Sequence, residues 1–221
     1  SGLIGKNKRL SDEKVFDDTL TELEDRGLIG WDKSANRYDL HPIVRSVTWE
    51  ELDGDGKRGV YENLHAHFEA VPNQFNDYTQ VNSLEDLAPA IELYNTLVGL
   101  GRYNDAYIVF RDCINHATLY RLSASQQRVE LLEMLFPDGL DQLPRLSDPA
   151  YQAFTLNALA LAYQFSGQPS RAASAFRQNI IIREGLQDDF SVGLCNLSNA
   201  LRLAGDLHEA GATAHRALVI T

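Results

Sequence analysis

Three segments of the chain repeat one pattern, and this repetition constrains the fold more than any other feature. They read "LVGLGRYNDAYIVFRDC" at 97–113, "AYQFSGQPSRAASAFRQ" at 162–178 and "ALRLAGDLHEAGATAHRA" at 200–217. In each segment an apolar helix end leads to a glycine, then a short turn, and then an alanine five residues after the glycine. A glycine commonly ends a helix because it accepts the left-handed backbone conformation. The alanines, at positions 106, 172 and 210, stand 66 and 38 residues apart, which indicates a degenerate array of helical hairpins.

The best-formed unit, residues 153–186, resembles the tetratricopeptide repeat (TPR) family. The residues on the family's consensus spacing are Leu156, Leu159, Ala160, Tyr163, Gly167, Ala172 and Phe176. The resemblance covers residues 84–221, but the last unit has Ala214 where an aromatic residue is usual. The stretch 123–146 is irregular, with one helix that we expect Ser123 and Gln126 to cap and then a loop rich in Pro and Gly. The resemblance implies a mainly α protein with a TPR-like α-α superhelical array.

The first 72 residues follow a different pattern. Ser11 or Asp12 can cap a helix that Gly27 ends, and "GLIGW" and "RYDL" then read as two short strands around the turn "DKSAN". Pro42 suits the first turn of a following helix. This order predicts a partial winged helix with a small β-hairpin at 1–72, truncated on its N-terminal side. We expect a linker at 73–83, after which Ser83 and Asp86 begin the helical array of residues 84–221.

The segment "RGLIGWD…NRYDLHPIVR" resembles the winged helix of STAND-type signalling ATPases, the NB-ARC-like group that includes plant resistance proteins and the apoptosome scaffold. In that family a hydrophobic–His–Asp motif opens the helix after the wing, and its histidine contacts the phosphates of bound ADP. Here the motif is Leu40-His41-Pro42, so the histidine matches and the acidic residue does not. The resemblance implies nucleotide sensing by His41, with Arg45 one turn along as a phosphate or acid contact. The alternative is a structural histidine that caps its own helix.

The TPR resemblance also implies a ligand surface. In that family the first helix of each repeat lines a concave groove that binds an extended peptide. By alignment, the groove positions that we take as peptide-binding candidates are Asn95, Phe154, Asn157, Leu161, Gln164, Asn199 and Arg202, with Ile91, Val98 and Cys195 at further groove positions. Amides between apolar side chains suit a peptide backbone, which needs both donors and acceptors. The alternative is that these amides only bond to neighbouring helices.

Charge and composition exclude several partners. The net charge is −11, and a strongly acidic surface disfavours nucleic acid and anionic membranes. The helix expected at 12–26, which would enter the major groove of DNA, carries seven acidic and two basic residues. No apolar run is long enough for a membrane span. We expect a cytoplasmic protein in which Cys113 and Cys195 are reduced.

No motif for catalysis or metal binding is present. The segment "LDGDGKRG" at 52–59 lacks the Gly and Glu positions of a calcium loop, so we expect a turn between helices there. His65 and His67 lie two residues apart, on different sides of a helix, and do not form a metal pair. The chain lacks G-x-x-x-x-G-K-[ST] and G-x-S-x-G. We therefore expect a non-enzymatic chain without cofactor, whose full-length parent would bind ADP or ATP.

These features lead to one functional prediction and two alternatives. We predict a non-catalytic regulatory fragment of a signalling ATPase, whose repeats bind a protein or peptide and whose winged helix relays to a nucleotide-binding domain of the same parent chain. Because Leu218, Val219 and Ile220 end the chain inside a helix, we expect a piece of a longer protein. The alternatives are a TPR-containing transcriptional regulator fragment and a plain TPR scaffold.

Overall fold

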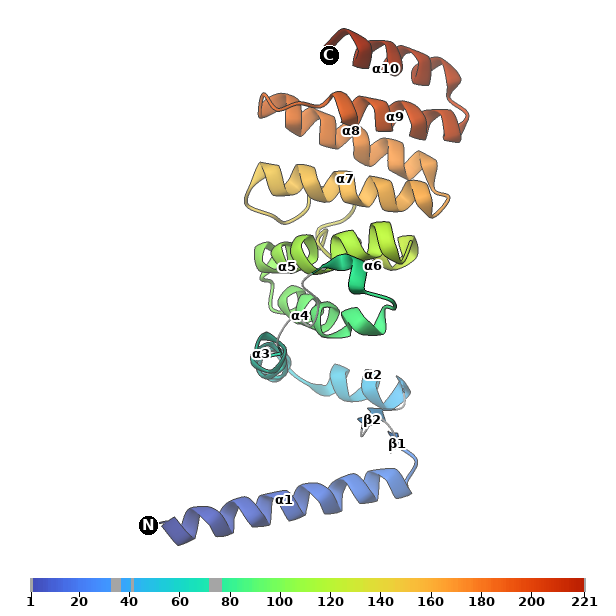
Figure 1. The fold of residues 1–221 in the computed structure, drawn as a ribbon. Coiled ribbons are helices and arrows are strands. Elements are labelled where there is room, and N and C mark those ends of the chain that lie inside the picture. The colour runs from blue at the N-terminus through green and yellow to red at the C-terminus, as the bar shows by residue number, and fades with distance from the viewer. Residues whose placement is uncertain (1, 33–36, 41, 72–76, 221) are drawn as a thin grey trace. The chain divides into compact units, whose positions relative to one another are not determined.

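The computed structural model describes residues 2–32, 37–40, 42–71 and 77–220 and is mainly helical, with one two-stranded antiparallel sheet (Figure 1). The chain divides into two compact units, Ser1–Gly59 and Val60–Thr221. The elements are α1 (Gly2–Asp25), β1 (Ile29–Asp32), β2 (Arg37–Leu40), α2 (Pro42–Glu51), α3 (Gly54–Glu69), η1 (Tyr78–Gln80), η2 (Glu85–Leu87), α4 (Ala88–Gly99), α5 (Tyr103–Val109), η3 (Phe110–Ile114), η4 (Ala117–Arg121), α6 (Ser125–Glu133), α7 (Pro149–Phe165), α8 (Pro169–Gly185), α9 (Ser191–Ala204) and α10 (Leu207–Ile220).

The first unit contains a helix, a β-hairpin and a second helix, in the order predicted. The helix α1 begins at Gly2, earlier than the capping signal at Ser11 indicates. Gly27 ends the turn after α1 with a φ of +69°, as expected. In the hairpin Ile29 pairs with Leu40, and the rings of Trp31 and Tyr38 stack with centroids 5.8 Å apart. This pair is a cross-strand contact of the kind that stabilises a two-stranded sheet.

The turn predicted at 52–59 is shorter in the structure. The helix α3 begins at Gly54, because the side chain of Asp53 accepts a hydrogen bond of 2.7 Å from the backbone N–H of Gly56. The prediction of a turn is therefore wrong from Gly54 onward. The boundary between the two units falls inside α3, after Gly59, whereas the sequence predicts a linker at 73–83. Residues 72–76 lie outside the described part of the chain, and that linker stays a prediction.

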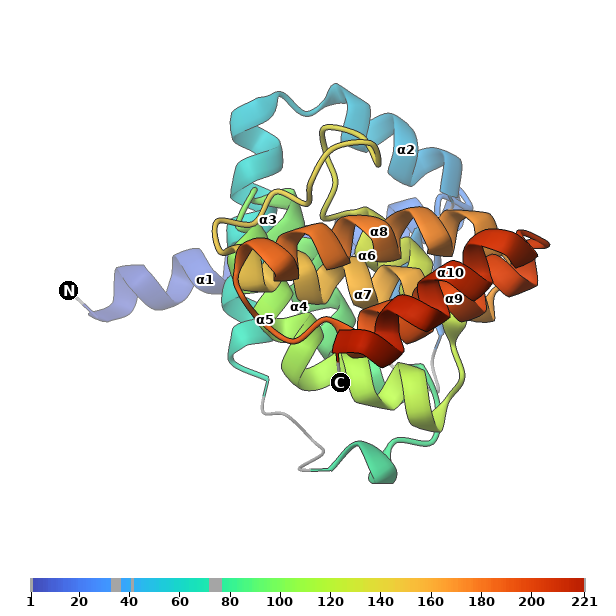
Figure 2. The ribbon, with the colours of Figure 1, turned by 90° about the horizontal axis from the view of Figure 1, so that it is seen from above.

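The second unit is a stack of helices that pack against their neighbours in chain order (Figures 1 and 2). Gly101, Gly167 and Gly205 end helices α4, α7 and α9 with φ of +72°, +80° and +90°. The alanines five residues later, at positions 106, 172 and 210, are all buried. The pattern seen in the sequence thus marks three tight helix–helix turns, each followed by a close contact between paired helices.

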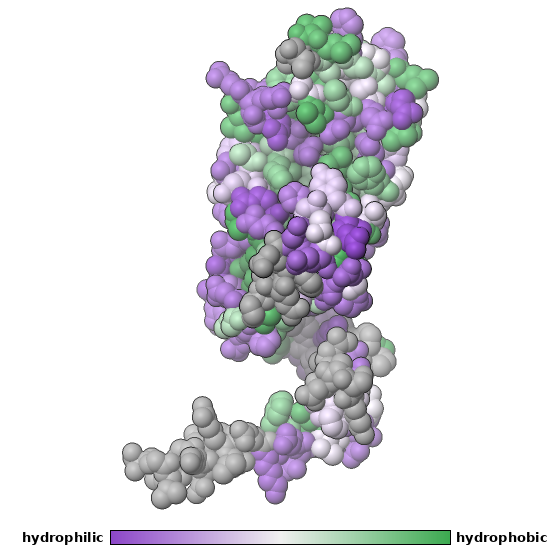
Figure 3. Space-filling model, in the orientation of Figure 1, coloured by the Kyte–Doolittle hydropathy of each residue, from purple (hydrophilic) through white to green (hydrophobic). Residues whose placement is uncertain are grey.

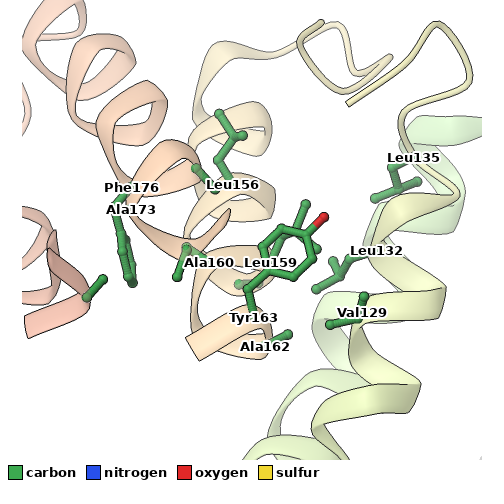
Figure 4. Packing of buried hydrophobic residues seen from close by; sticks show 14 of the residues in the cluster. Val129, Leu132, Leu135, Leu156, Leu159, Ala160, Ala162, Tyr163, Ala173 and Phe176 are labelled. Carbon is green, nitrogen blue, oxygen red and sulfur yellow. The ribbon is translucent and has the colours of Figure 1, made fainter. Parts of the chain in front are cut away.

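The core of the second unit runs continuously through α4 to α10. Every residue on the TPR-like spacing of the best-formed unit is buried apart from its glycine. The ring of Tyr163 lies among Val129, Leu132 and Leu159, while Phe176 packs on the other side of α7 (Figure 4). In the last unit Ala214 stands where the TPR resemblance leads us to expect an aromatic residue, and it is exposed. Phe176, at the equivalent position of α8, is fully buried. Hydrophilic and hydrophobic residues are mixed over the surface in view (Figure 3).

The segment before α6 departs from regular α-helix. The elements η3 and η4 are π-helical turns, and a buried arginine, Arg128, satisfies the acceptors around them. Its guanidinium donates to the backbone oxygen of Asn115 at 2.7 Å, to Oδ1 of Asn115 at 3.0 Å and to Oγ1 of Thr118 at 2.9 Å. The capping box predicted at Ser123 is wrong: Ser123 has a φ of +51°, and α6 begins two residues later without a side-chain cap. A turn after η4, instead of a side-chain cap, therefore precedes the first residue of α6.

Candidate functional site

Four predicted groove residues share one face of α7. Phe154, Asn157, Leu161 and Gln164 follow a spacing of three, four and three residues, which places them along one side of a helix. All four are half-buried, between the buried core and open solvent. We call this set the α7 face. It presents two apolar side chains and two amides in alternation.

The amides of the α7 face have unused hydrogen-bonding groups. The Oε1 atom of Gln164 is buried and has no partner in the described part of the chain. The side chain of Asn157 likewise makes no hydrogen bond with the described residues, although it is half-buried. A buried acceptor without a donor costs free energy.

Phe154 contributes to packing as well as to the face. Its ring meets the ring of Tyr107 on α5 edge to face, with centroids 5.5 Å apart, and Tyr107 stacks on Tyr151 at 4.3 Å. Burial raises the pKa of Tyr107, so its hydroxyl stays protonated at neutral pH. The guanidinium of Arg111 lies 5.6 Å from the centre of the Tyr107 ring. This aromatic cluster fixes α7 against α5 at one end of the face.

On α9 the predicted residues Asn199 and Arg202 contact each other. Oδ1 of Asn199 accepts a hydrogen bond of 2.9 Å from Arg202, which leaves the amide N–H groups of Asn199 as donors. Seven arginines among the described residues of 60–221 pair with a carboxylate, and Arg202 is not one of them. By the 38-residue step of the repeat, Arg202 corresponds to Gln164 on α7. Cys195 is exposed and lines an apolar cavity of about 430 Å³ between α9 and α10.

The α4 candidates are more deeply involved in packing. Ile91 and Val98 pack against the hydrophobic core, and Asn95 between them is half-buried without a hydrogen bond to the described residues. The structure therefore brings the candidates together within α7 and within α9. On α4, Asn95 is the single polar candidate.

In the first unit, Arg45 is exposed and pairs with Asp39 at 3.0 Å across the junction of β2 and α2. Both side chains are largely in solvent, so the pair contributes little stability and Arg45 can exchange it for another anion. His41 lies outside the described residues.

Sequence reasoning missed a large cavity in the second unit. It has a volume of about 760 Å³ and lies between the α4–α5 turn and the loop before α7. Its charged residues pair within its wall: Arg102 bonds to Asp105 at 2.7 Å, and Arg145 forms two hydrogen bonds with Asp138, which hold the pKa of that carboxyl below its usual value. The Pro- and Gly-containing loop at 134–148 was the available signal, but its partner turn could not be identified from sequence.

The described residues contain no group of three or more His, Cys, Asp or Glu side chains that could hold a metal ion. In the same part of the chain, every helix is too short or too polar to cross a bilayer. Neither Cys113 nor Cys195 forms a disulfide bond within it.

No protein-family model, curated protein or solved structure matches this chain.

Proposed function

We propose that residues 84–221 form a TPR-like array that binds an extended segment of a partner protein, and that the chain has a regulatory, non-catalytic role. The observation that carries the proposal is the α7 face, where half-buried amides alternate with half-buried apolar side chains along one side of the helix. An extended peptide supplies backbone N–H and C=O groups at regular intervals, which match an acceptor at Gln164 and donors at Asn157 and Asn199. Phe154 and Leu161 would contact apolar side chains of the same segment.

The test uses peptides selected from a random library for their binding to the immobilised chain. A selected peptide, labelled and titrated by fluorescence anisotropy, should bind an Asn157→Ala, Asn199→Ala double variant about tenfold more weakly, because two hydrogen bonds are lost. Gln164→Ala should also weaken binding. Gln126→Ala, which removes an exposed amide on α6, is the matched control and should bind as the original chain does. Unchanged affinity in the double variant would remove the α7 and α9 faces as the site.

We propose further that this chain is the regulatory part of a STAND-type signalling ATPase. The order of helix, β-hairpin and helix, together with an exposed Arg45 that can exchange Asp39 for a phosphate, supports this wider role. In a parent chain with a nucleotide-binding domain, His41→Ala and Arg45→Ala should each speed the release of bound ADP. Lys57→Ala, a basic residue of the same unit that lies 5.8 Å from the Trp49 ring, is the control. If the parent chain releases ADP at the same rate in all three variants, this chain has no nucleotide link and the plain TPR scaffold is favoured.

The transcription-regulator alternative makes a different prediction. The described side chains of α1 include five exposed acids, at positions 17, 18, 22, 24 and 25, which would repel DNA phosphates. We therefore expect no shift of duplex DNA mobility by this chain at low salt. A salt-dependent shift would favour the regulator instead.

A further inference from the structure

His65 on α3 makes a specific contact with the rest of the second unit. Its Nε2 atom lies 3.0 Å from Nη1 of Arg102, in the turn between α4 and α5. One helical turn earlier, the ring of Tyr61 lies against Gly99, where an added Cβ would come within 2.2 Å of a ring carbon. Tyr61 and His65 are four residues apart and so share one side of α3. Together these contacts hold α3 against the end of α4.

The chemistry of the two groups fixes the protonation of the ring. A guanidinium has only donors, so Nε2 of His65 must accept the hydrogen bond. The ring is then neutral, with its proton on Nδ1, which faces Oε2 of Glu69 at 3.5 Å. A second proton on Nε2 would remove the acceptor and place two positive charges about 3 Å apart.

The neighbouring charges give the ring two alternative partners. Glu69, on its own helix, faces Nδ1 of the ring, whereas Arg102, in the α4–α5 turn, faces Nε2. Asp105 holds Arg102 in place at 2.7 Å, and the pair formed by Asp138 and Arg145 lines the same cavity. The side chain of His65 is 16% exposed, so protons reach it without unfolding of the helix.

We propose that the His65–Arg102 contact is a pH-sensitive switch, which holds α3 on the α4–α5 turn while the ring is neutral and releases it when the ring is protonated. The helix has no buried residue among its described side chains, and Tyr61 on the same side of it contacts Gly99. The boundary between the two compact units lies within α3, between Gly59 and Val60. Acidification would therefore loosen the helix through which the first unit connects to the array.

Hydrogen exchange of the full chain at about pH 8 and about pH 5 tests the switch. After correction for the intrinsic pH dependence of exchange, amides of residues 61–69 should exchange about tenfold faster or more at the lower pH, as expected for the loss of a bond to a charged donor. Amides of α7 and α8 should not change by that amount. Equal protection of α3 at both values would overturn the proposal.

Three variants separate the switch from a merely structural histidine. His65→Gln keeps an acceptor that does not titrate, so α3 should stay protected at both pH values. His65→Lys supplies a permanent positive charge and should give fast exchange at both. His67→Gln removes the neighbouring exposed histidine, which contacts Phe68, and should leave the pH response intact.

The nitrogen chemical shifts of the His65 ring test the tautomer directly and need no variant. At about pH 8 they should show Nε2 without a proton and Nδ1 protonated, the reverse of the usual preference in free histidine. A protonated Nε2 at that pH, or a pH response that persists in His65→Gln, would contradict the switch.

Discussion

At the scale of single residues, Arg128 shows what a buried charge requires. The side chain is 1% exposed, and its partners are the neutral oxygens of Asn115 and Thr118 together with the ring of Phe110, 5.6 Å from the guanidinium carbon. Burial lowers the pKa of Arg128 to about 10, so the group stays charged at neutral pH. The Thr118 hydroxyl also donates to the backbone oxygen of Asn115, so the π-helical segment depends in part on this guanidinium.

Replacing Arg128 tests that dependence. Arg128→Ala should lower the free energy of unfolding by about 3–5 kcal/mol, because it leaves a cavity and buried acceptors without donors. Arg128→Met, which fills most of the volume, should cost less. Urea unfolding of both variants measures this, with the exposed Arg202→Ala expected within about 0.5 kcal/mol of the original chain. A loss below about 1 kcal/mol for Arg128→Ala would show that the segment does not need the guanidinium.

Tyr94 predicts how stability changes in alkaline solution. Its hydroxyl is fully buried and donates to the backbone oxygen of Leu131, and burial raises its pKa well above the ordinary value of about 10. The folded state therefore keeps a proton that the unfolded chain releases, so this contribution is complete below about pH 10 and is lost as the pH rises further. Denaturant unfolding at increasing alkaline pH should show a falling free energy, with a shallower fall in Tyr94→Phe. An unchanged slope in that variant would exclude Tyr94 as a cause.

At the scale of elements, helix α9 packs on α8 through a glycine. A Cβ on Gly193 would lie 3.2 Å from Oδ1 of Asn179 and 3.2 Å from Cγ1 of Ile180, both of them buried. The amide of Asn179 is itself held by a hydrogen bond of 2.6 Å to the backbone oxygen of Ala153 on α7. Neighbouring helices are thus linked by close contacts between small residues, and the ion pair Arg177–Glu209 at 2.7 Å links α8 to α10.

Two matched glycine variants test this interface. Gly193→Val should destabilise the second unit by about 1–3 kcal/mol, because the new side chain must displace two buried neighbours. Gly211→Val lies on α10, where an added Cβ would meet no described atom within 4 Å, and should be neutral or slightly stabilising, since glycine is a poor helix former. Thermal unfolding measures both. Equal effects of the two substitutions would contradict a close α8–α9 contact.

At the scale of the whole molecule, the two units differ in how many of their described apolar side chains are buried. Among the described residues of the first unit, Ile29 is the one buried apolar side chain, whereas the core of the second runs from Tyr94 to Ala217. Stability comes largely from apolar burial, so the described side chains of the first unit contribute little to it.

We expect this difference in hydrogen exchange. Amides of α1 and α2 should exchange at least about tenfold faster than those of α7 and α8, because local opening of a segment with few buried contacts costs little free energy. Mass spectrometry of peptic fragments from the full chain would show it. Similar protection in both units would mean that the first unit has a source of stability that its described side chains do not reveal.

The local signals in the sequence predicted much of the second unit. Gly101, Gly167 and Gly205 mark real helix ends, because the left-handed backbone conformation is a property of the single residue. The spacing along α7 predicted which residues share a face, because that follows from 3.6 residues per turn. The predictions for His41, for the nucleotide link and for peptide binding stay predictions.

The sequence by itself determined the helical class, the position of the tight turns and the rows of apolar residues, since each depends on residues within one or two helical turns. Only the tertiary structure decided which polar groups find partners. Arg128 meets Asn115, His65 meets Arg102 across 37 residues, and Gln164 is left with a buried acceptor that no described donor reaches. Such pairings depend on the position and angle at which separate helices meet, and no short segment of sequence specifies these.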